Sequence, residues 1–493
     1  MSGTAAQAPG VLPDYRGGSI VNLMASIGFA LIVARFEGRS ASTSVSNADI
    51  ARIFGRYTTL PRTRLRRRAR ISPSSGAWAS TWPARSRKSS RRAVRGRPDL
   101  SARLRLTYNY ERTFSRAVCS MLIMGRDAVT LFLCGDVMTG RGIDQILSAP
   151  SDPGLFESYI DDARAYVRLA EQLNGPIPRH VDYSYVWGVG LGMLAHVGPA
   201  ARIVNLETSV TASEAAWPGK GINYRMHPKN VGVLTAARLD VCVLANNHVI
   251  DWGFAGLDDT LETLHAAGIR TAGAGADADE AAAPAVVGLE GGGHVLVYAS
   301  GSETSGIPSA WAAGRGAPGV NVVDEFSVTT AQRLGARIAR ERAGGDIAVV
   351  SVHWGPNWGY SIPREQRAFA HALIDSGAVD VVHGHSSHHA KGIEVYRGKP
   401  IIYGCGDFVT DYEGISGHEE YRGDLSLAYF PTFDGATAEF SGLRIVPMRM
   451  LRFALHDVSR TDAEWLQAIL TREGKQFSTR AELDAGTEIH LRW

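Results

Sequence analysis

Residues 379–389 read VDVVHGHSSHH, a mostly apolar run that ends in four histidines. Four other apolar runs also end in an acid, an amide or a histidine: LFLC leads into Gly135-Asp136, RIVN into Leu206-Glu207, VCVLA into Asn246-Asn247-His248, and IAVVSV into His353. In open α/β sheets, functional sites form beyond the carboxyl ends of the strands. A sheet that brings these five ends together therefore collects carboxylates, amides and imidazoles in one place.

The chain around these strand ends alternates between short apolar runs and amphipathic stretches, which predicts an α/β domain over residues 126–415. Helical spacing of apolar residues predicts helices over Gly256–Ala267 and Arg364–Ser376. Residues 416–493 are interpreted as a C-terminal extension that packs on this domain, with two strands and a helix near Asp462–Arg472. The predicted strands are Val129–Cys134, Arg202–Asn205, Val241–Ala245, Val295–Ala299, Ile347–Val352, Val379–Val382, Pro400–Tyr403, Leu425–Phe430 and Leu443–Pro447.

Residues 1–125 contain a strongly basic stretch. The 493-residue chain has a net charge of +3, but Arg62–Arg105 holds 15 Lys and Arg and one acid, Asp99, which leaves 3 − 14 = −11 for the rest. This stretch is rich in Arg, Ser, Ala and Pro and has almost no apolar periodicity, which predicts a poorly structured, disordered segment. Contact with nucleic acid or an anionic membrane is one interpretation. The composition favours a solvated linker, or a segment read in the wrong frame or from a wrong start, over nucleic-acid binding.

The sequence contains no clear signal peptide or membrane span. The most apolar N-terminal stretch, Ile20–Phe36, is interrupted by Asn22 and Ser26 and is shorter than the roughly 20 residues that a span needs. The four cysteines form no CxxC motif, so buried thiols in a reduced compartment are expected. A cytoplasmic or peripheral membrane location is therefore predicted, with membrane association left open.

The side chains at the strand ends are ligands for divalent cations such as Mn²⁺, Fe²⁺ or Zn²⁺, because they offer carboxylate, amide and imidazole donors and no thiolate. A carboxylate shared by two such cations, about 3.5–4 Å apart, is typical of sites that activate a water molecule and hold a phosphoryl oxygen. Two divalent metal ions are therefore expected.

Six ordered motifs resemble those of the CapA family of bacterial capsule and poly-γ-glutamate synthesis proteins, a branch of the calcineurin-like metallophosphoesterases. They are GDVMTGRGIDQ, NLETS, ANNHVIDWG, VHWGPNWGY, HGHSSHH and GKPIIYGCGDF, and they cover Leu131 to Asp411. The resemblance implies a metallo-dependent phosphatase-like α/β fold of two packed mixed β-sheets flanked by helices. It also implies a role with the machinery of capsule or cell-envelope polymer synthesis.

The resemblance also implies roles for particular residues. Asp136 and His388 would bind one metal ion, and Glu207 stands at the position of the bridging carboxylate. Asn247, His353 and His385 would bind the second ion. Arg141 is a candidate for binding the anionic substrate.

His248 and Asp251 are the candidates for proton transfer. His248 follows the predicted ligand Asn247 and cannot easily be a ligand as well. A helical turn would place Asp251 on the same side, where it could orient the imidazole and raise its pKa, leaving a proton for the leaving group. The competing interpretation of Asp251 is an N-cap for the helix that follows.

Two departures from the superfamily pattern keep two functions open. Met138 stands where an imidazole is usual, and thioether sulfur is a poor ligand for a hard cation. Asp407 stands where family members usually carry Asn, and it either adds a carboxylate to the site or caps a turn. The first hypothesis is a metal-dependent hydrolase of phosphoesters. The alternative is a non-catalytic accessory protein that binds metal and an anionic polymer during polymer synthesis or export.

Overall fold

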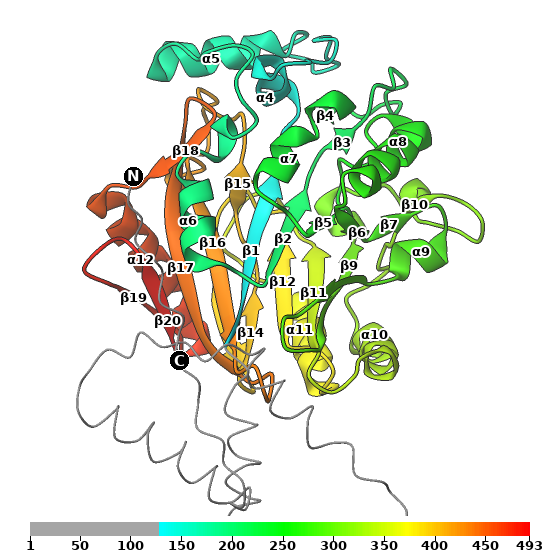
Figure 1. Cartoon of the computed structure of the whole chain (residues 1–493), viewed down its shortest axis with the longest axis vertical. Coiled ribbons are helices and arrows are strands. Elements are labelled where there is room, and N and C mark those ends of the chain that lie inside the picture. Colours follow the sequence, from blue (N-terminus) through cyan, green and yellow to red (C-terminus); the bar gives the residue numbers. More distant parts are fainter. Residues whose placement is uncertain (1–127) are drawn as a thin grey trace, which may run out of the picture. The chain divides into compact units, whose positions relative to one another are not determined.

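The structure is a computed structural model that describes residues 128–493 (Figure 1). The predicted disordered basic segment, residues 1–125, lies outside the described residues. Among residues 128–493, none of the helices combines the length and apolar content needed to cross a lipid bilayer.

The first of two large sheets has ten strands and is mixed. Strands β1, β2, β5 and β6 are parallel to one another, and β16 pairs antiparallel with β1. The three-residue strand β15 also pairs with β1, and β18 pairs with β17. The order is β19 (Arg480–Leu483), β20 (Ile489–Arg492), β17 (Phe440–Leu451), β16 (Leu425–Phe433), β1 (Val129–Val137), β2 (Ala201–Leu206), β5 (Val241–Val243) and β6 (Arg270–Ala272), with β15 (Asp407–Val409) and β18 (Ala454–Asp457) beside this path.

The second sheet has six strands, of which the central four are parallel and the two outer ones antiparallel. Its order is β13 (Ile393–Tyr396), β14 (Lys399–Ile402), β12 (Val381–His385), β11 (Ile347–His353), β9 (His294–Gly301) and β8 (Ala285–Gly288). Two short pairs complete the strands: β3 (Ser209–Val210) with β4 (Arg225–Met226), and β7 (Ala274–Gly275) with β10 (Gly319–Val320).

The main core lies between the two sheets. Parallel strands covered on both faces read as continuous apolar runs, and every residue of β11 is buried. His383 on β12 links the sheets, because its Nε2 donates to the Cys134 carbonyl oxygen on β1 at 2.9 Å. His383 therefore has a structural role within the cluster of histidines that ends β12.

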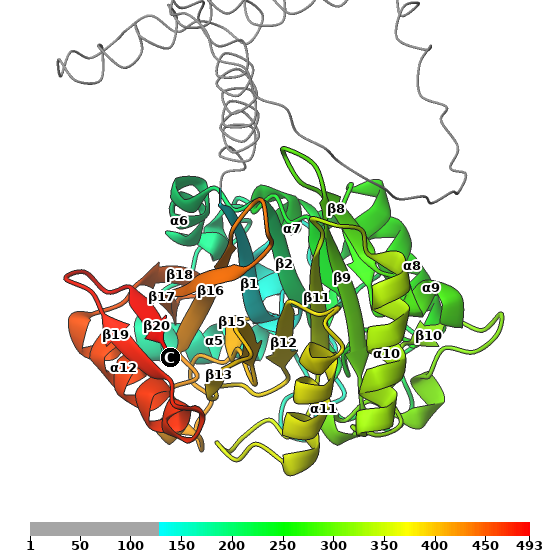
Figure 2. The same ribbon diagram turned by 90° about the horizontal axis from the view of Figure 1, so that it is seen from below.

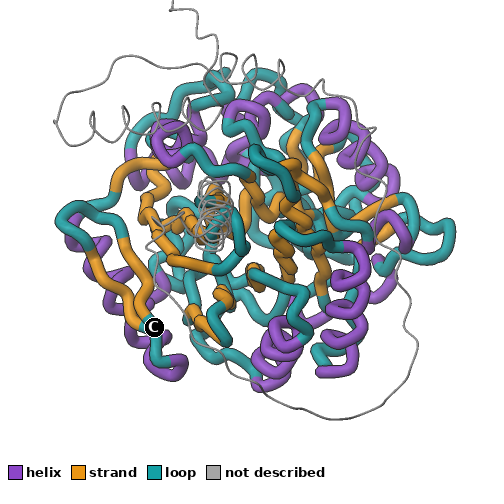
Figure 3. The backbone as a smooth tube through the Cα atoms, turned by 60° about the horizontal axis from the view of Figure 1, so that its bottom comes forward, coloured by secondary structure: helices purple, strands orange, loops and turns teal. Residues whose placement is uncertain are grey.

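The helices lie around the strands (Figure 3). α10 and α11 pack on the outer face of the six-stranded sheet, where Phe369 and Ile338 join a second apolar cluster (Figure 2). The helices are α4 (Arg141–Ile146), α5 (Arg164–Asn174), α6 (Gly190–Val197), α7 (Gly232–Ala236), α8 (Gly253–Ala266), α9 (Ala278–Ala282), α10 (Val328–Glu341), α11 (Arg364–Asp375) and α12 (Arg460–Gly474).

The predicted fold of two packed mixed sheets flanked by helices is confirmed. Each predicted apolar run corresponds to a strand, and the helices predicted at 256–267, 364–376 and 462–472 are α8, α11 and α12. Strands β16 to β20, within residues 416–493, belong to the same sheet as β1. The boundary at residue 416 stays a prediction.

Candidate metal centre

The six predicted metal ligands converge from five strand ends. All are buried except Asn247, which is half-buried. They are Asp136 near the end of β1, Glu207 directly after β2, Asn247 in the turn after β5, His353 at the end of β11, His385 at the end of β12, and His388 three residues further on.

A bulge in β1 directs Asp136 toward the site. The register between β1 and β2 shifts between Cys134 and Asp136. Gly135 fills the bulge, because a Cβ atom there would lie 1.8 Å from the carbonyl oxygen of Gly406. Beyond this close approach, β15 pairs with β1 so that Asp136 and Asp407 are partners. Two carboxylates therefore lie side by side.

The converging side chains form two groups that share Asp136. One group is Asp136, His353 and His385, and the other is Asp136, His388 and Asp407. Within each group, one potential ligand atom per residue lies within 4.8 Å of the others. This spacing is that of atoms able to surround one cation, and the shared carboxylate links the two groups.

A relay of hydrogen bonds sets the tautomer of His385. Because His383 Nε2 donates to a carbonyl oxygen, its Nδ1 accepts from the Ser351 hydroxyl at 3.0 Å. The Ser351 oxygen then accepts from His385 Nε2 at 2.8 Å. Nδ1 of His385 is left without a proton, and it faces Nδ1 of His353 at 2.9 Å and Asp136 Oδ1 at 3.9 Å. Such fixation by neighbouring groups is typical of metal-ligating histidines.

Glu207 and Asn247 lie on the other side of His353. Glu207 Oε1 is 3.9 Å from His353 Nε2, and Asn247 Oδ1 is 2.9 Å from the same nitrogen. The Asn205 amide donates to Asp136 Oδ1 at 2.7 Å and to Glu207 Oε2 at 3.3 Å, which joins the two carboxylates. The structure thus brings all six predicted ligands together, and their binding of metal stays a prediction.

The chemistry of these groups fits a divalent cation. Asp136 Oδ2 and Asp407 Oδ2 are buried and have no hydrogen-bond partner. Burial and the neighbouring Asp407 raise the pKa of Asp136 to about 7, and burial and Asp136 raise that of Glu207 well above its ordinary value. Burial and nearby histidines lower the pKa of His353 well below its usual range, so the ring is neutral, as ligation requires. A cation would neutralise the carboxylates and use the free imidazole lone pairs.

His248 and Asp251 meet as predicted, and Asp251 orients the ring. His248 Nδ1 lies 2.6 Å from Asp251 Oδ2, while Nε2 faces Glu207 Oε1 at 3.8 Å. The predicted rise in the pKa of His248 is wrong: burial lowers it to about 4, against the opposing effect of Asp251. The N-cap interpretation of Asp251 is also wrong, since α8 begins after Trp252 and has no side-chain cap.

Lys220 is the cation beside this pair, and no sequence motif predicted it. Its Nζ forms an ion pair with Asp251 Oδ1, donates to the Asn247 carbonyl oxygen, and lies 3.1 Å from His248 Nδ1. The backbone N–H of Tyr224 donates to the other Asp251 oxygen at 2.7 Å. Asp251 is therefore held from three sides, and its charge is shared between Lys220 and His248.

Arg141 lies in a buried ion-pair network. Its guanidinium forms two hydrogen bonds with Asp411, at 2.6 and 3.2 Å, and one with Glu157 at 2.9 Å. The side chain is also covered by the rings of Tyr166 and Tyr224. These partners favour a structural role, and the predicted contact with a substrate anion stays a prediction.

Three residues of the site had weak or absent signals in the sequence. Lys220 lies in the irregular segment between β3 and β4, where no pattern marks it. Asn205 ends a predicted strand but carried no assigned role. The sequence allowed two roles for Asp407, a metal ligand or a turn cap. Its position beside Asp136 places it in the site.

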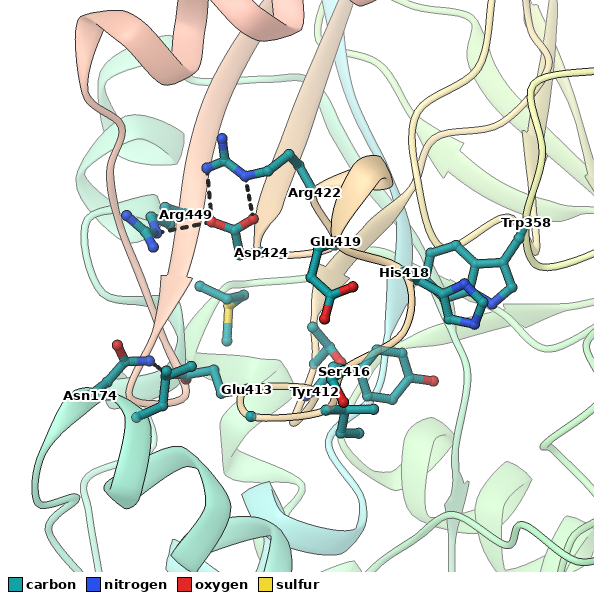
Figure 4. A pocket seen from close by; sticks show the side chains of 16 residues that line it. Asn174, Trp358, Tyr412, Glu413, Ser416, His418, Glu419, Arg422, Asp424 and Arg449 are labelled. Atoms are coloured by element: carbon teal, nitrogen blue, oxygen red, sulfur yellow. Dashed lines mark hydrogen bonds and ion pairs between the residues drawn. The ribbon is translucent and has the colours of Figure 1, made fainter.

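A pocket of about 400 Å³ is lined in part by Trp358, Tyr412 and His418 (Figure 4). Trp358 and Tyr412, which line it, also contact the ring of His388. On the other side of the pocket, Arg449 and Arg422 both pair with Asp424. The pocket thus offers a space of mixed polar and apolar lining beside the ring of His388.

Two mixed β-sheets flanked by helices, with carboxylates and imidazoles at the strand ends, define an α/β protein whose fold is consistent with the metallophosphoesterase-like fold. The family model described as "Bacterial capsule synthesis protein PGA_cap" matches residues 130–412. This match covers more than half of the chain, so the protein belongs to that family.

Curated relatives agree with this assignment. A "Probable polyglutamine synthesis accessory protein" of Mycobacterium tuberculosis is 48% identical over 72% of this chain and 93% of its own length. The "Capsule biosynthesis protein CapA" of Bacillus anthracis is 26% identical over 76% of this chain and 81% of its own. The "PGA biosynthesis protein CapA" of Bacillus subtilis is 27% identical over 58% of this chain and 64% of its own.

Proposed function

We propose that this protein acts in the synthesis of capsule or poly-γ-glutamate polymers, through a two-metal site that hydrolyses a phosphoester. The family and the names of its relatives support the first part. The observation that carries the second is the pair of ligand groups that share Asp136, whose Oδ2 is buried without a partner.

The residues of the site would form two cation-binding subsites. Asp136, His388 and Asp407 would hold one cation, and Asp136, His353 and His385, with Glu207 and Asn247 close by, would hold the other. When bound, two such cations supply an activated water and neutralise charge on the phosphoryl group. The pocket beside His388 would receive the rest of the substrate.

His248 would move the proton at Nε2. Its Nδ1 hydrogen is donated to Asp251, so the second nitrogen is the one that exchanges protons. Because the pKa is low, Nε2 carries no proton at neutral pH. In this proposal Nε2 accepts a proton from the attacking water and then donates it to the leaving oxygen. Lys220 and Asp251 would hold the ring in place through both steps.

Replacing His248 with alanine tests the proposed reaction. With full-length protein loaded with Mn²⁺, hydrolysis of generic phosphomonoesters and phosphodiesters is expected to fall roughly 10²–10⁴-fold, while the bound Mn²⁺, measured by elemental analysis, stays unchanged. His265→Ala, an exposed histidine on α8, is the matched control and should keep full activity. A fully loaded wild type without hydrolysis, or His248→Ala with undiminished hydrolysis, would contradict the proposal.

The accessory role without hydrolysis is the alternative, and Met138 favours it. This side chain is buried two residues after Asp136, and its sulfur lies 3.6 Å from the Tyr412 hydroxyl. A thioether there does not supply the imidazole that phosphoesterases of this superfamily usually carry. The alternative expects saturable binding of poly-γ-glutamate that is lost in Glu207→Ala, with no hydrolysis under any metal.

A further inference from the structure

The two ligand groups around Asp136 differ in chemical character. The group with His353 and His385 offers two imidazoles and one carboxylate. The group with His388 and Asp407 offers two carboxylates and one imidazole. Imidazole suits Zn²⁺ and Fe²⁺, whereas carboxylate oxygens suit harder cations such as Mn²⁺ and Mg²⁺. The two subsites are therefore unequal.

Asp407 is the residue that creates this inequality. It is the first residue of β15, and the parallel pairing of β15 with β1 fixes it beside Asp136. The residue is 2% exposed. Oδ1 lies 2.8 Å from His388 Nδ1, and Oδ2 has no hydrogen-bond partner.

Two unpartnered carboxylate oxygens in one buried place are unfavourable without a positive charge. Asp136 Oδ2 and Asp407 Oδ2 are in this situation. Arg141, the buried cation five residues along the chain from Asp136, is already paired with Asp411 and Glu157. Met138 offers only a soft sulfur at this end of β1. A divalent cation between the two carboxylates would compensate their negative charge.

We propose that Asp407 is itself a metal ligand, and that it makes the subsite of Asp136, His388 and Asp407 selective for a hard cation such as Mn²⁺. The subsite of His353 and His385 takes Zn²⁺ or Fe²⁺ in preference. This inference rests on the two-metal part of the proposed function and is independent of hydrolysis. The rival explanation is that Asp407 only orients His388 through Oδ1, as carboxylates beside metal-bound histidines do.

Asp407→Asn separates the two explanations. The amide oxygen can still accept from His388 Nδ1, so the orientation of the ring is kept while the charge is lost. Metal-free full-length protein is dialysed against Mn²⁺ in large excess over Zn²⁺, because Zn²⁺ binds a given site with such ligands more tightly than Mn²⁺, and the bound metals are measured by elemental analysis. Wild type is expected to hold one Mn²⁺ and one Zn²⁺ per chain. Asp407→Asn is expected to lose the Mn²⁺, with at least tenfold weaker affinity in calorimetric titration, and to keep the Zn²⁺.

Asp346→Asn is the matched control. Asp346 is 3% exposed and lies 3.2 Å from His294 Nδ1, so it forms the same kind of carboxylate–histidine pair outside the site. This variant should bind both metals as wild type does. Asp407→Ser, also neutral but smaller, should repeat the selective loss of Mn²⁺.

Retention of Mn²⁺ by Asp407→Asn would overturn the proposal and leave Asp407 as an orienting residue. Simultaneous loss of both metals from Asp407→Asn and Asp407→Ser would overturn it too, because the subsites would then not be separable. Metal content is measured without substrate. The metal-content result can therefore be interpreted even if the protein does not hydrolyse phosphoesters.

Discussion

Replacing Asp136 with asparagine is expected to weaken binding of both metal ions by about a hundredfold or more, since even outer-sphere partners of metal ligands contribute 10–100-fold. Asp136 is the carboxylate that the two ligand groups share, so this single change reaches both. Isothermal titration of the metal-free protein with Mn²⁺ measures the loss. Asp144→Asn is the control, because Asp144 is also buried but accepts hydrogen bonds only from groups outside the metal centre.

The same variant should gain stability when no metal is present. The pKa of Asp136 is raised from 3.8 to about 7 in the folded protein, so its contribution to stability is complete at low pH and is lost as the pH rises through about 7. At pH 8 the metal-free Asp136→Asn protein should therefore unfold at higher urea than wild type, by on the order of 4 kcal/mol, since the pKa rises from 3.8 to about 7 and each pKa unit corresponds to about 1.4 kcal/mol. Near pH 4 the difference should vanish. Equal stability at pH 8, together with unchanged Mn²⁺ affinity, would contradict the placement of Asp136.

Replacing Arg141 with methionine is expected to destabilise the protein by about 3–5 kcal/mol, because it leaves buried carboxylates without their cation. The guanidinium holds Asp411, beside β15, and Glu157, in the segment before α5, with side-chain exposures of 2% or less. Urea denaturation monitored by circular dichroism measures the change in free energy of unfolding.

Arg337→Met is the comparison for Arg141. Arg337 pairs with Glu341 one turn along α10, and both side chains are about one-third exposed, so its removal should cost under about 1 kcal/mol. A small effect of Arg141→Met on stability, combined with a large loss of substrate binding, would reverse the assignment. It would restore the role in anion binding that the sequence predicted.

The sequence predicted the central strands and their polar ends because both signals are local. β11 is a continuous apolar run that stops at His353, and the same pattern marks β1, β2, β5 and β12. The short antiparallel strands β8, β13 and β18 were not predicted, since each has only four residues, too few for a clear pattern. Each pairs with the strand next to it along the chain.

The electrostatics of the site could not be predicted from sequence. The pKa of His248 was expected to rise because Asp251 lies three residues away. The direction of the pKa shift also depends on burial and on Lys220, which both lower the pKa. Lys220 reaches the pair from a loop that no motif marks. The role of Asp407 depends on the register of a three-residue strand against β1, which no local pattern reveals.

Anomalous X-ray scattering from crystals grown with Mn²⁺ and Zn²⁺ tests the convergence of these side chains most directly. Two peaks about 3.5–4 Å apart are expected, which is the usual separation in two-metal sites. Asp136 should contact both, the Mn²⁺ peak should lie beside Asp407 and His388, and the Zn²⁺ peak beside His353 and His385. Absence of any peak within reach of Asp136 would contradict the metal centre itself.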